Sequence, residues 1–430
     1  MRSEWQVTDT GNDSREQMAR LPVMALGAGF DLLSGIRVLD LTTSVAGPYA
    51  TQLLADMGAE VVKLERAGSG DDARGWGPPF LDGESLWFLS VNRNKRSIAV
   101  DLAQPAGRAI FEDLLRVSDV LVLNQPPRTA AKLGLDQETI RTIRPEIVYV
   151  SITGYGLTGE YADRTCYDLI AEGYSGIMDL TGDADGQPQK IGAPAADMLA
   201  GQDAAFAALA ALLDRGRTGR GHVIDISLIE SMTRFLSCRI VPYLGSGMPP
   251  RRSGGKDSVI AIYQTFETAD EPITLALGNN AIWKRFWEAV GLPERASTPR
   301  FATNELRHAH RKEIVEEIQA ILITRPRKHW LDLSASARFP AGPINRVEDV
   351  VGEQFLLDRQ LFYTVKEGNR QVPQVGTGIR IDGSFPIPRK MPPRLGEDTR
   401  SVLREILSYD DEQIADLTLR GAVHDLQEAK

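Results

Sequence analysis

The sequence predicts an α/β fold in which a large domain built on a parallel sheet is followed by a smaller α+β domain. Short β-branched runs alternate with helical patterns over residues 35–228, which is typical of parallel strands joined by helices. A Gly/Pro/Arg-rich stretch at 245–258 interrupts this alternation. After it, residues 259–278 have the pattern of an antiparallel hairpin.

The elements of the large domain follow one another in chain order. Strands are predicted at 35–42, 59–65, 96–102, 119–124, 147–153 and 222–228. Helices are predicted at 47–58, 105–118, 136–145, 197–214 and 229–245, then at 281–291 and 311–324, and finally at 399–408 and 411–420. Ligands of such sheets bind outside the carboxyl ends of the strands.

Composition excludes several classes of protein. The 49 basic and 58 acidic residues give a net charge of −9, so we expect no nucleic-acid partner, because phosphate backbones require a cationic face. We expect no membrane span and no signal peptide. Cys166 and Cys238 lack metal-ligand spacing and favour a reducing compartment. The sequence therefore predicts a cytoplasmic protein without a metal site, with His308 and His310 on an exposed helix face.

Residues 154–159, Gly-Tyr-Gly-Leu-Thr-Gly, satisfy the G-x-G-x-x-G pattern of dinucleotide-binding folds. In nicotinamide and flavin enzymes the third glycine opens a helix, and the motif lies in the first βα turn. Here the polar run "EYADRT" follows and several strands precede. We therefore interpret the motif as a turn from strand to loop, where backbone N–H groups can meet a different ligand.

Asp197 stands at the start of an apolar helix, in "KIGAPAADMLAGQDAAF". On the pattern alone a helix cap, worth about 1 kcal/mol, is the favoured interpretation. A cap does not require small neighbours, however, and those around Asp197 would let a bulky group reach the carboxylate: Gly192, Ala193, Ala195, Ala196, Ala200 and Gly201. A carboxylate at a helix N-terminus stays ionised and can act as a covalent nucleophile.

Seven longer motifs run through the chain from Gly35 onward: "GIRVLDLTTSVAGPYATQLLADMGAEVVKLER", "NRNKRSIAVDL", "SITGYGLTG", "YDLIAEGYSGIMDLTG", "GAPAADMLAG", "RTGRGHVIDISLIES" and "LGEDTRSVLREIL". Together and in this order they resemble the class III CoA-transferases, the formyl-CoA transferase and carnitine CoA-transferase type. The resemblance implies an acyl-CoA:carboxylate CoA-transferase with Asp197 as its catalytic residue.

By this resemblance, the Asp197 carboxylate attacks an acyl-CoA thioester, giving a mixed anhydride and free CoA thiolate. The thiolate then forms an aspartyl-CoA thioester, from which the acceptor acid takes the CoA. Succinyl-CoA is the implied donor. A carboxylate near its reference pKa of about 3.9 needs no general base. The CoA thioester is a substrate, and no permanently bound cofactor or metal is implied.

The resemblance also assigns contacts with CoA. They fall on Val45, Ala46, Arg66, Val100, Asp101, Leu102, Asn124, Lys132, Gly154, Tyr155 and Gly156. Arg66 is the best cation for a CoA phosphate, whereas Lys132 is equally well explained as a solvated surface charge. Trp76 either approaches the acyl group or is a packed aromatic.

In assembly, the resemblance implies an interlocked, ring-like homodimer of chains that each have a Rossmann-like large domain and a small domain. We expect the chain to divide into an N-terminal extension (1–34), the first part of the large CoA-binding domain (35–228), a linker (229–256), the small α+β domain (257–340), a return linker (341–395) and C-terminal helices that complete the large domain (396–430).

The main alternative activity is that of a 2-methylacyl-CoA racemase, because the same family contains such isomerases. They need acid/base groups on both faces of the α-carbon. Racemases carry a His-Asp pair where this chain has Tyr167-Asp168, and tyrosine, with a pKa of about 10, is a poor base at neutral pH. We therefore predict a transferase and keep the racemase as the alternative.

Overall fold

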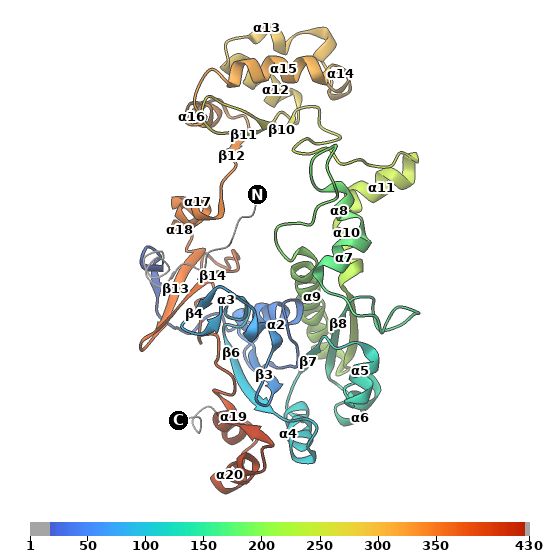
Figure 1. Ribbon diagram of the computed structural model, residues 1–430, viewed down its shortest axis with the longest axis vertical. Coiled ribbons are helices and arrows are strands. Elements are labelled where there is room, and N and C mark those ends of the chain that lie inside the picture. The colour runs from blue at the N-terminus through green and yellow to red at the C-terminus, as the bar shows by residue number, and fades with distance from the viewer. Residues whose placement is uncertain (1–17, 426–430) are drawn as a thin grey trace, which may run out of the picture. The chain divides into compact units, whose positions relative to one another are not determined.

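A computed structural model describes residues 18–425 (Figure 1). Two compact units are present: the first contains the described residues of 1–175, 192–236 and 353–430, and the second contains 176–191 and 237–352. These borders differ from the expected segments, since 176–191 belongs to the smaller unit and 353–395 to the larger one. Residues 1–17 of the expected extension and 426–430 of the expected C-terminal segment lie outside the described residues.

The first unit is built on a seven-stranded sheet. Its strands are β2 (Arg37–Asp40), β3 (Glu60–Arg66), β6 (Lys95–Val100), β7 (Val120–Leu123), β8 (Val148–Thr153), β9 (His222–Ser227) and β15 (Val423–His424). Their order is β15-β6-β3-β2-β7-β8-β9. All pairs are parallel except β15 with β6. The six parallel strands, numbered along the chain, therefore lie in the Rossmann order 3-2-1-4-5-6, in which ligands bind where the winding reverses, between β2 and β7.

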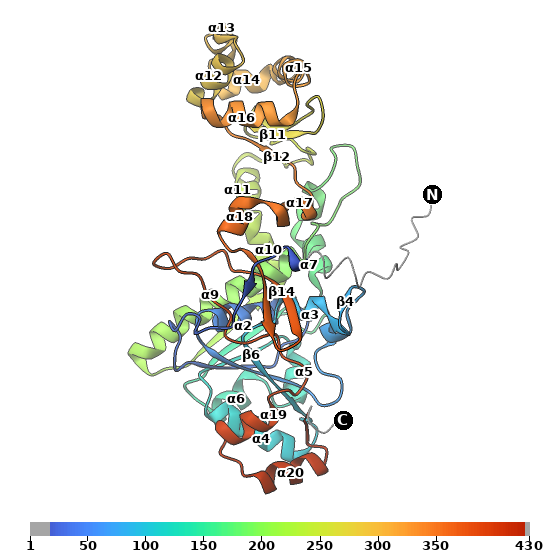
Figure 2. The same ribbon diagram turned by 90° about the vertical axis from the view of Figure 1, so that its left-hand side faces the viewer.

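Helices cover both faces of this sheet, and the predicted parallel α/β architecture is confirmed. The helices of the first unit are α2 (Ala46–Asp56), α3 (Leu86–Ser90), α4 (Pro105–Arg116), α5 (Pro127–Lys132), α6 (Gln137–Ile143), α7 (Asp168–Ser175), α9 (Ala195–Thr218), α10 (Leu228–Phe235), α18 (Gln354–Asp358), α19 (Thr399–Glu405) and α20 (Asp411–Leu419). Figure 2 shows α4 and α19 on the opposite side of the strands from α2.

The two faces of the sheet differ in chemistry because strand residues alternate between them. Residues such as Leu39 and Val62 pack with α4 and α19 in one apolar cluster. On the α2 face, fully buried charges come from three neighbouring strands: Asp40 of β2, Lys63 of β3 and Lys95 of β6. Lys95 Nζ contacts Asp40 Oδ2 at 3.1 Å and donates to the carbonyl oxygen of Pro48 in α2 at 2.8 Å. Buried charges of this kind are stable only when paired and hydrogen-bonded.

Helix α9 packs closely against α2. Small residues are buried along this side of α9, among them Ala196, Ala200 and Gly201. A Cβ atom on Gly201 would lie 2.6 Å from the carbonyl oxygen of Ala46, so only glycine allows this approach. Helix packing thus explains Gly201, which corrects the expectation that this small residue serves the approach of a ligand.

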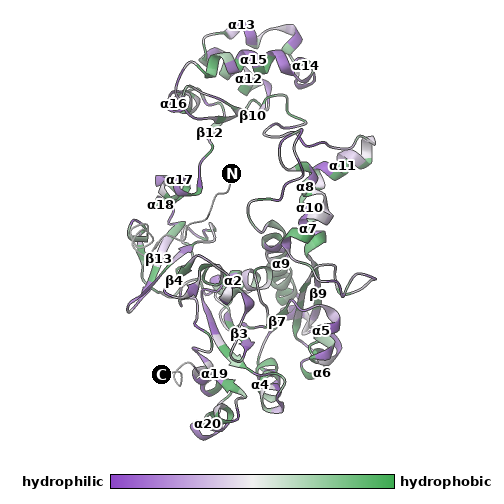
Figure 3. Cartoon of the chain, in the orientation of Figure 1, coloured by the Kyte–Doolittle hydropathy of each residue, from purple (hydrophilic) through white to green (hydrophobic). Residues whose placement is uncertain are grey.

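Hydrophobic residues occupy most of α9 (Figure 3). Among the described helices it alone is long and apolar enough to cross a membrane, a test that core helices of soluble proteins also pass. Part of α9 is buried against α2 and the sheet, so packing in the first unit explains the apolar residues on that side of the helix.

The segment expected as a return linker contains regular structure. Strands β13 (Phe362–Glu367) and β14 (Arg370–Val375) form an antiparallel hairpin, and β1 (Val23–Met24), from the expected N-terminal extension, pairs with β13 in parallel. Arg370 donates to both carboxylate oxygens of Glu84, at 2.7 and 2.8 Å. This anchors the hairpin beside the small ladder of β4 (Phe80–Leu81) and β5 (Glu84–Ser85).

The second unit is an α+β unit. It contains β10 (Tyr263–Phe266), β11 (Ile273–Ala276), β12 (Ala341–Pro343), α8 (Ile177–Leu180), α11 (Ser237–Ser246), α12 (Asn280–Ala289), α13 (Pro293–Ala296), α14 (Asn304–Ala309), α15 (Arg311–Leu322), α16 (Arg327–Ala337) and α17 (Val347–Gly352). The predicted hairpin is confirmed as β10–β11, packed on Trp283 and Trp287 of α12. The helix expected at 229–245 is divided, since α10 ends at Phe235 and α11 begins at Ser237.

Candidate active site

A cavity of about 200 Å³ lies in the first unit at the carboxyl ends of β2, β7 and β8. Its lining includes Ser44 and Ala46 after β2, Asn124 after β7, Gly154 after β8, and Asp197 of α9. The cavity therefore stands where the winding of the sheet reverses, the position expected for a ligand in this fold.

The loop after β2 is fixed residue by residue. Lys63 Nζ donates to the Thr42 carbonyl oxygen at 2.7 Å. Asn124 accepts from Thr43 N at 3.1 Å and donates to the Thr43 carbonyl oxygen at 2.8 Å. Ser44, whose φ is 71°, donates its N–H to Asp71 Oδ1 at 2.9 Å. These bonds hold the loop in place before a ligand arrives, and they commit the side-chain amide of Asn124 to positioning it.

Asp197 is the third residue of α9, and its carboxylate lines the cavity. The helix cap position belongs to Pro194, so the interpretation of Asp197 as a cap is wrong. Asp168 instead supplies the acceptor, because its Oδ1 receives the N–H of Ala196 at 2.8 Å and that of Asp197 at 3.3 Å. Within the described residues the Asp197 carboxylate has neither a hydrogen-bond donor nor an ion-pair partner.

The surroundings of Asp197 change its ionisation. Its residue is 9% exposed, and burial, reinforced by the charge of Asp168, raises its pKa from 3.8 to about 7. This corrects the expectation of a pKa near the reference value. Burial and then the charge of Asp197 raise the pKa of the neighbouring Cys166 thiol to about 11. At neutral pH the thiol stays protonated, whereas Asp197 is divided between its acid and carboxylate forms.

A second cavity, of about 620 Å³, adjoins the first, since Thr43 and Asp72 line both. It brings together four residues assigned to CoA by resemblance: Arg66, Val100, Asp101 and Leu102. Arg66 forms an ion pair with Asp72, and its side chain is 60% exposed. Leu133 and Leu135 add apolar surface, so the cavity combines an accessible cation with a hydrophobic wall.

The remaining predicted residues lie around these two cavities. Lys132 is the exposed last residue of α5 and lines neither of them. Val45 is buried just before α2. Tyr155 and Gly156 also lie outside both linings. The loop that contains Tyr155 and Gly156 is held at Leu157, whose N–H donates to both carboxylate oxygens of Asp225 at 2.9 and 3.0 Å.

The glycine motif at 154–159 lies in the loop after β8. After Gly154–Gly159 the next helix is α7, which begins at Asp168, so the glycines form the expected turn from strand to loop. A Cβ atom on Gly154 would lie 2.1 Å from Cβ of Cys166, so close packing explains why this residue is glycine.

Trp76 meets Trp87 edge-on, with ring centroids 6.0 Å apart, and packs on a buried cluster. These contacts favour the interpretation of Trp76 as a packed aromatic.

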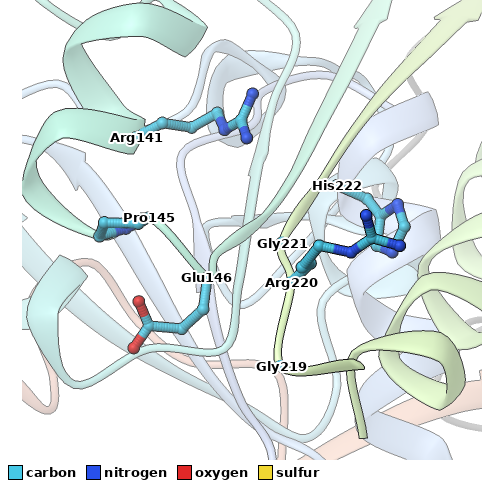
Figure 4. Close-up of a pocket in the computed structure, with 7 residues that line it drawn as sticks. All are labelled: Arg141, Pro145, Glu146, Gly219, Arg220, Gly221 and His222. Carbon is cyan, nitrogen blue, oxygen red and sulfur yellow. The ribbon is translucent and has the colours of Figure 1, made fainter. Parts of the chain in front are cut away.

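A third cavity, of about 630 Å³, lies at the amino ends of β8 and β9 (Figure 4). Arg141 of α6 and Arg220, just before β9, both line it. This cavity contains none of the predicted site residues, and ligands of parallel sheets bind at the other end of the strands. The Asp197 cavity is therefore the candidate active site.

Known proteins resemble the chain over most of its length. The family model "CoA-transferase family III" matches residues 33–399. Mouse succinyl-CoA:glutarate CoA-transferase is 40% identical over 394 residues, which cover 91% of this chain and 90% of the mouse protein. Succinate–glutarate CoA-transferase from Agrobacterium fabrum is 40% identical over 382 residues, with coverages of 87% and 95%. The crystal structure of a CAIB/BAIF family protein from Brucella suis superposes with a TM-score of 0.77 at 36% identity, covering 88% of this chain and 100% of that one.

Proposed function

Since this chain belongs to CoA-transferase family III and is a CoA-transferase, we propose that succinyl-CoA is its donor, that a small dicarboxylic acid is its acceptor, and that Asp197 is its nucleophile. The names of the mouse and Agrobacterium relatives, which pair succinyl-CoA or succinate with glutarate, support the two substrates. One observation carries the choice of Asp197: a buried carboxylate without a partner among the described residues faces a cavity at the switch point of the sheet.

The proposed reaction proceeds by exchange of acyl groups on Asp197. The deprotonated carboxylate attacks the thioester carbonyl, the C–S bond breaks, and CoA thiolate leaves a mixed anhydride. The thiolate then attacks the aspartyl carbonyl and releases the donor acid. The acceptor carboxylate repeats these two steps in reverse order, which yields the new thioester and restores Asp197. Such covalent catalysis divides one difficult exchange into easier steps.

CoA is proposed to lie in the 620 Å³ cavity, with Arg66 at a phosphate and the thioester arm directed past Thr43 toward Asp197. The residues shared by the two linings support this path. Arg66 would exchange its contact with Asp72 for the phosphate, since an exposed ion pair is worth little in water. The contacts of Val45, Ala46, Asn124, Tyr155, Gly156 and Lys132 with CoA remain predictions.

We also propose a homodimer. Large apolar side chains are exposed on α9 and α10 of the first unit, including Phe206 (75%), Leu213 (70%) and Phe235. Exposed apolar groups gathered on neighbouring helices favour a protein interface. The interlocked arrangement follows from the resemblance alone, and light scattering of the full chain measures the proposed stoichiometry. A cytoplasmic location remains a prediction from the sequence.

The covalent step is tested by intact mass spectrometry after incubation with succinyl-CoA, followed by peptide mapping. We expect an acyl or CoA adduct on Asp197 that hydroxylamine releases and that Asp197→Ala lacks. Asp203→Asn, on the same helix, should keep the adduct. If no acyl-CoA gives an adduct while the protein exchanges the α-proton of a 2-methylacyl-CoA, the racemase replaces the transferase.

A further inference from the structure

More negative than positive side chains line the Asp197 cavity. Two carboxylates, Asp72 and Asp197, and one cation, Arg164, border it among the described residues. Asp72 is paired with Arg66. Once Asp197 has lost its proton, a substrate that brings a second carboxylate therefore meets a negative site in which Arg164 is the available counter-charge.

Arg164 is held in a way that leaves its donors open. Its guanidinium carbon lies 3.6 Å from the centroid of the Tyr161 ring, and its backbone N–H donates to the Tyr161 carbonyl oxygen at 2.9 Å. Within residues 18–425 no carboxylate forms an ion pair with this side chain. Stacking fixes a guanidinium plane and leaves its edge free to bind a planar anion.

Two other arginines of the first unit are already committed: Arg74 follows β3, and Arg93 precedes β6. Arg74 pairs with Glu65 at 2.6 Å, and Arg93 pairs with Asp56 at 2.6 Å. The Arg93 pair is buried and Arg74 is partly buried, and Arg93 also donates to the Val375 carbonyl oxygen at 2.8 Å. These side chains stabilise the fold, whereas Arg164 is the one arginine among the described residues that lines the Asp197 cavity.

We propose that Arg164 binds the carboxylate of a dicarboxylic substrate that does not react, and so selects dicarboxylic over monocarboxylic acyl groups. This inference rests on the proposed function. The reacting carbonyl must approach Asp197, and a bidentate Arg–carboxylate contact at the far end of the chain would hold it there. Arg164 and Asp197 line the same cavity, so one small substrate can contact both.

The first measurement is the single-turnover rate of acylation by succinyl-CoA and by butyryl-CoA, which differ by the carboxylate. We expect wild type to prefer succinyl-CoA and Arg164→Gln to lower that preference by about 10- to 100-fold, the range of a hydrogen bond to a charged group. Arg164→Lys, which keeps the charge without the bidentate fork, should recover part of it. Arg220→Gln, in the distant cavity, should leave the preference unchanged.

A structural role would give a different result. If Arg164→Gln and Arg164→Lys slow both thioesters by the same factor, the proposal is overturned, because the preference itself would not depend on Arg164.

A binding measurement separates this proposal from the covalent mechanism. Glutarate should raise the melting temperature of wild type more than pentanoate does, and Arg164→Gln should abolish that difference without any turnover. If wild type forms no adduct but the glutarate difference depends on Arg164, the nucleophile assignment fails and the recognition proposal stands. Equal shifts by the two acids in wild type would overturn the recognition proposal.

Discussion

Replacing Asp197 by asparagine should stabilise the protein, by an amount that grows with pH. The substitution preserves the shape of the side chain and removes a charge that is 9% exposed. Burial and the charge of Asp168 raise the pKa of Asp197 from 3.8 to about 7. The folded protein therefore binds this proton more tightly than the unfolded chain does, and its stability falls as the pH rises between those two values.

The magnitude follows from the same pKa values. A rise from 3.8 to about 7 corresponds to about 4 kcal/mol at roughly 1.36 kcal/mol per pH unit, and the positive end of α9 offsets about 1 kcal/mol of it. We expect a gain of about 3 kcal/mol above pH ~7 and no gain below pH ~4. At roughly 2.1 cal/mol/K per residue, 430 residues convert this gain into a rise of about 3 °C in melting temperature.

The assay is thermal unfolding of wild type and Asp197→Asn across this pH range. Asp185→Asn, at an exposed position in the second unit, controls for the loss of one negative charge and should show no such trend. If the difference in melting temperature between Asp197→Asn and wild type does not change with pH, or if the variant melts below wild type at pH ~8, the charge of Asp197 does not destabilise the folded protein and the argument is refuted.

Two more predictions follow from the same region. In wild type, the acylation rate is expected to rise with pH through about 7, as Asp197 loses its proton. Asp168→Asn removes a negative charge but keeps an oxygen for the N–H of Ala196, so this rise in rate should move to lower pH. An unchanged pH profile would show that Asp168 does not act on Asp197. Gly201→Ala should lower the free energy of unfolding by about 1–3 kcal/mol because its Cβ would lie 2.6 Å from a carbonyl oxygen. Gly216→Ala, on the same helix with nothing within 4 Å, should raise it by up to about 1 kcal/mol, and equal effects in denaturant titrations would contradict the packing argument.

Local patterns predicted most of the large sheet. Its β-branched runs and the intervening helices alternate with clear periods, and the strands lie within a few residues of the expected ranges. The hairpin β13–β14 was missed because β14, "RQVPQV", is polar and contains a proline. Its pairing with β13 and the bonds of Arg370 to Glu84, 286 residues away, are long-range contacts that no local pattern predicts.

The candidate site was predictable in part. Motifs identified Asp197 and the loops around it, but not the state of its carboxylate. That state depends on burial of Asp197 and on the charge of Asp168, whose bonds to the start of α9 join residues 28 and 29 positions apart. The sequence did not identify Arg164, because a sequence pattern does not distinguish an arginine that forms an ion pair from one that does not. Only the arrangement in space separates them.

The first unit is assembled from three separate stretches of chain, and this has a consequence for biosynthesis. Its last strand, β15, completes the sheet beside Val100 and Ala99, next to the cavity that contains Val100, Asp101 and Leu102. About 190 residues separate the end of the second stretch, at 236, from this strand, so at roughly 5–20 residues per second a ribosome needs about 10–40 s to deliver it. During that interval the nascent chain carries an open sheet edge at β6, and the second unit can fold first.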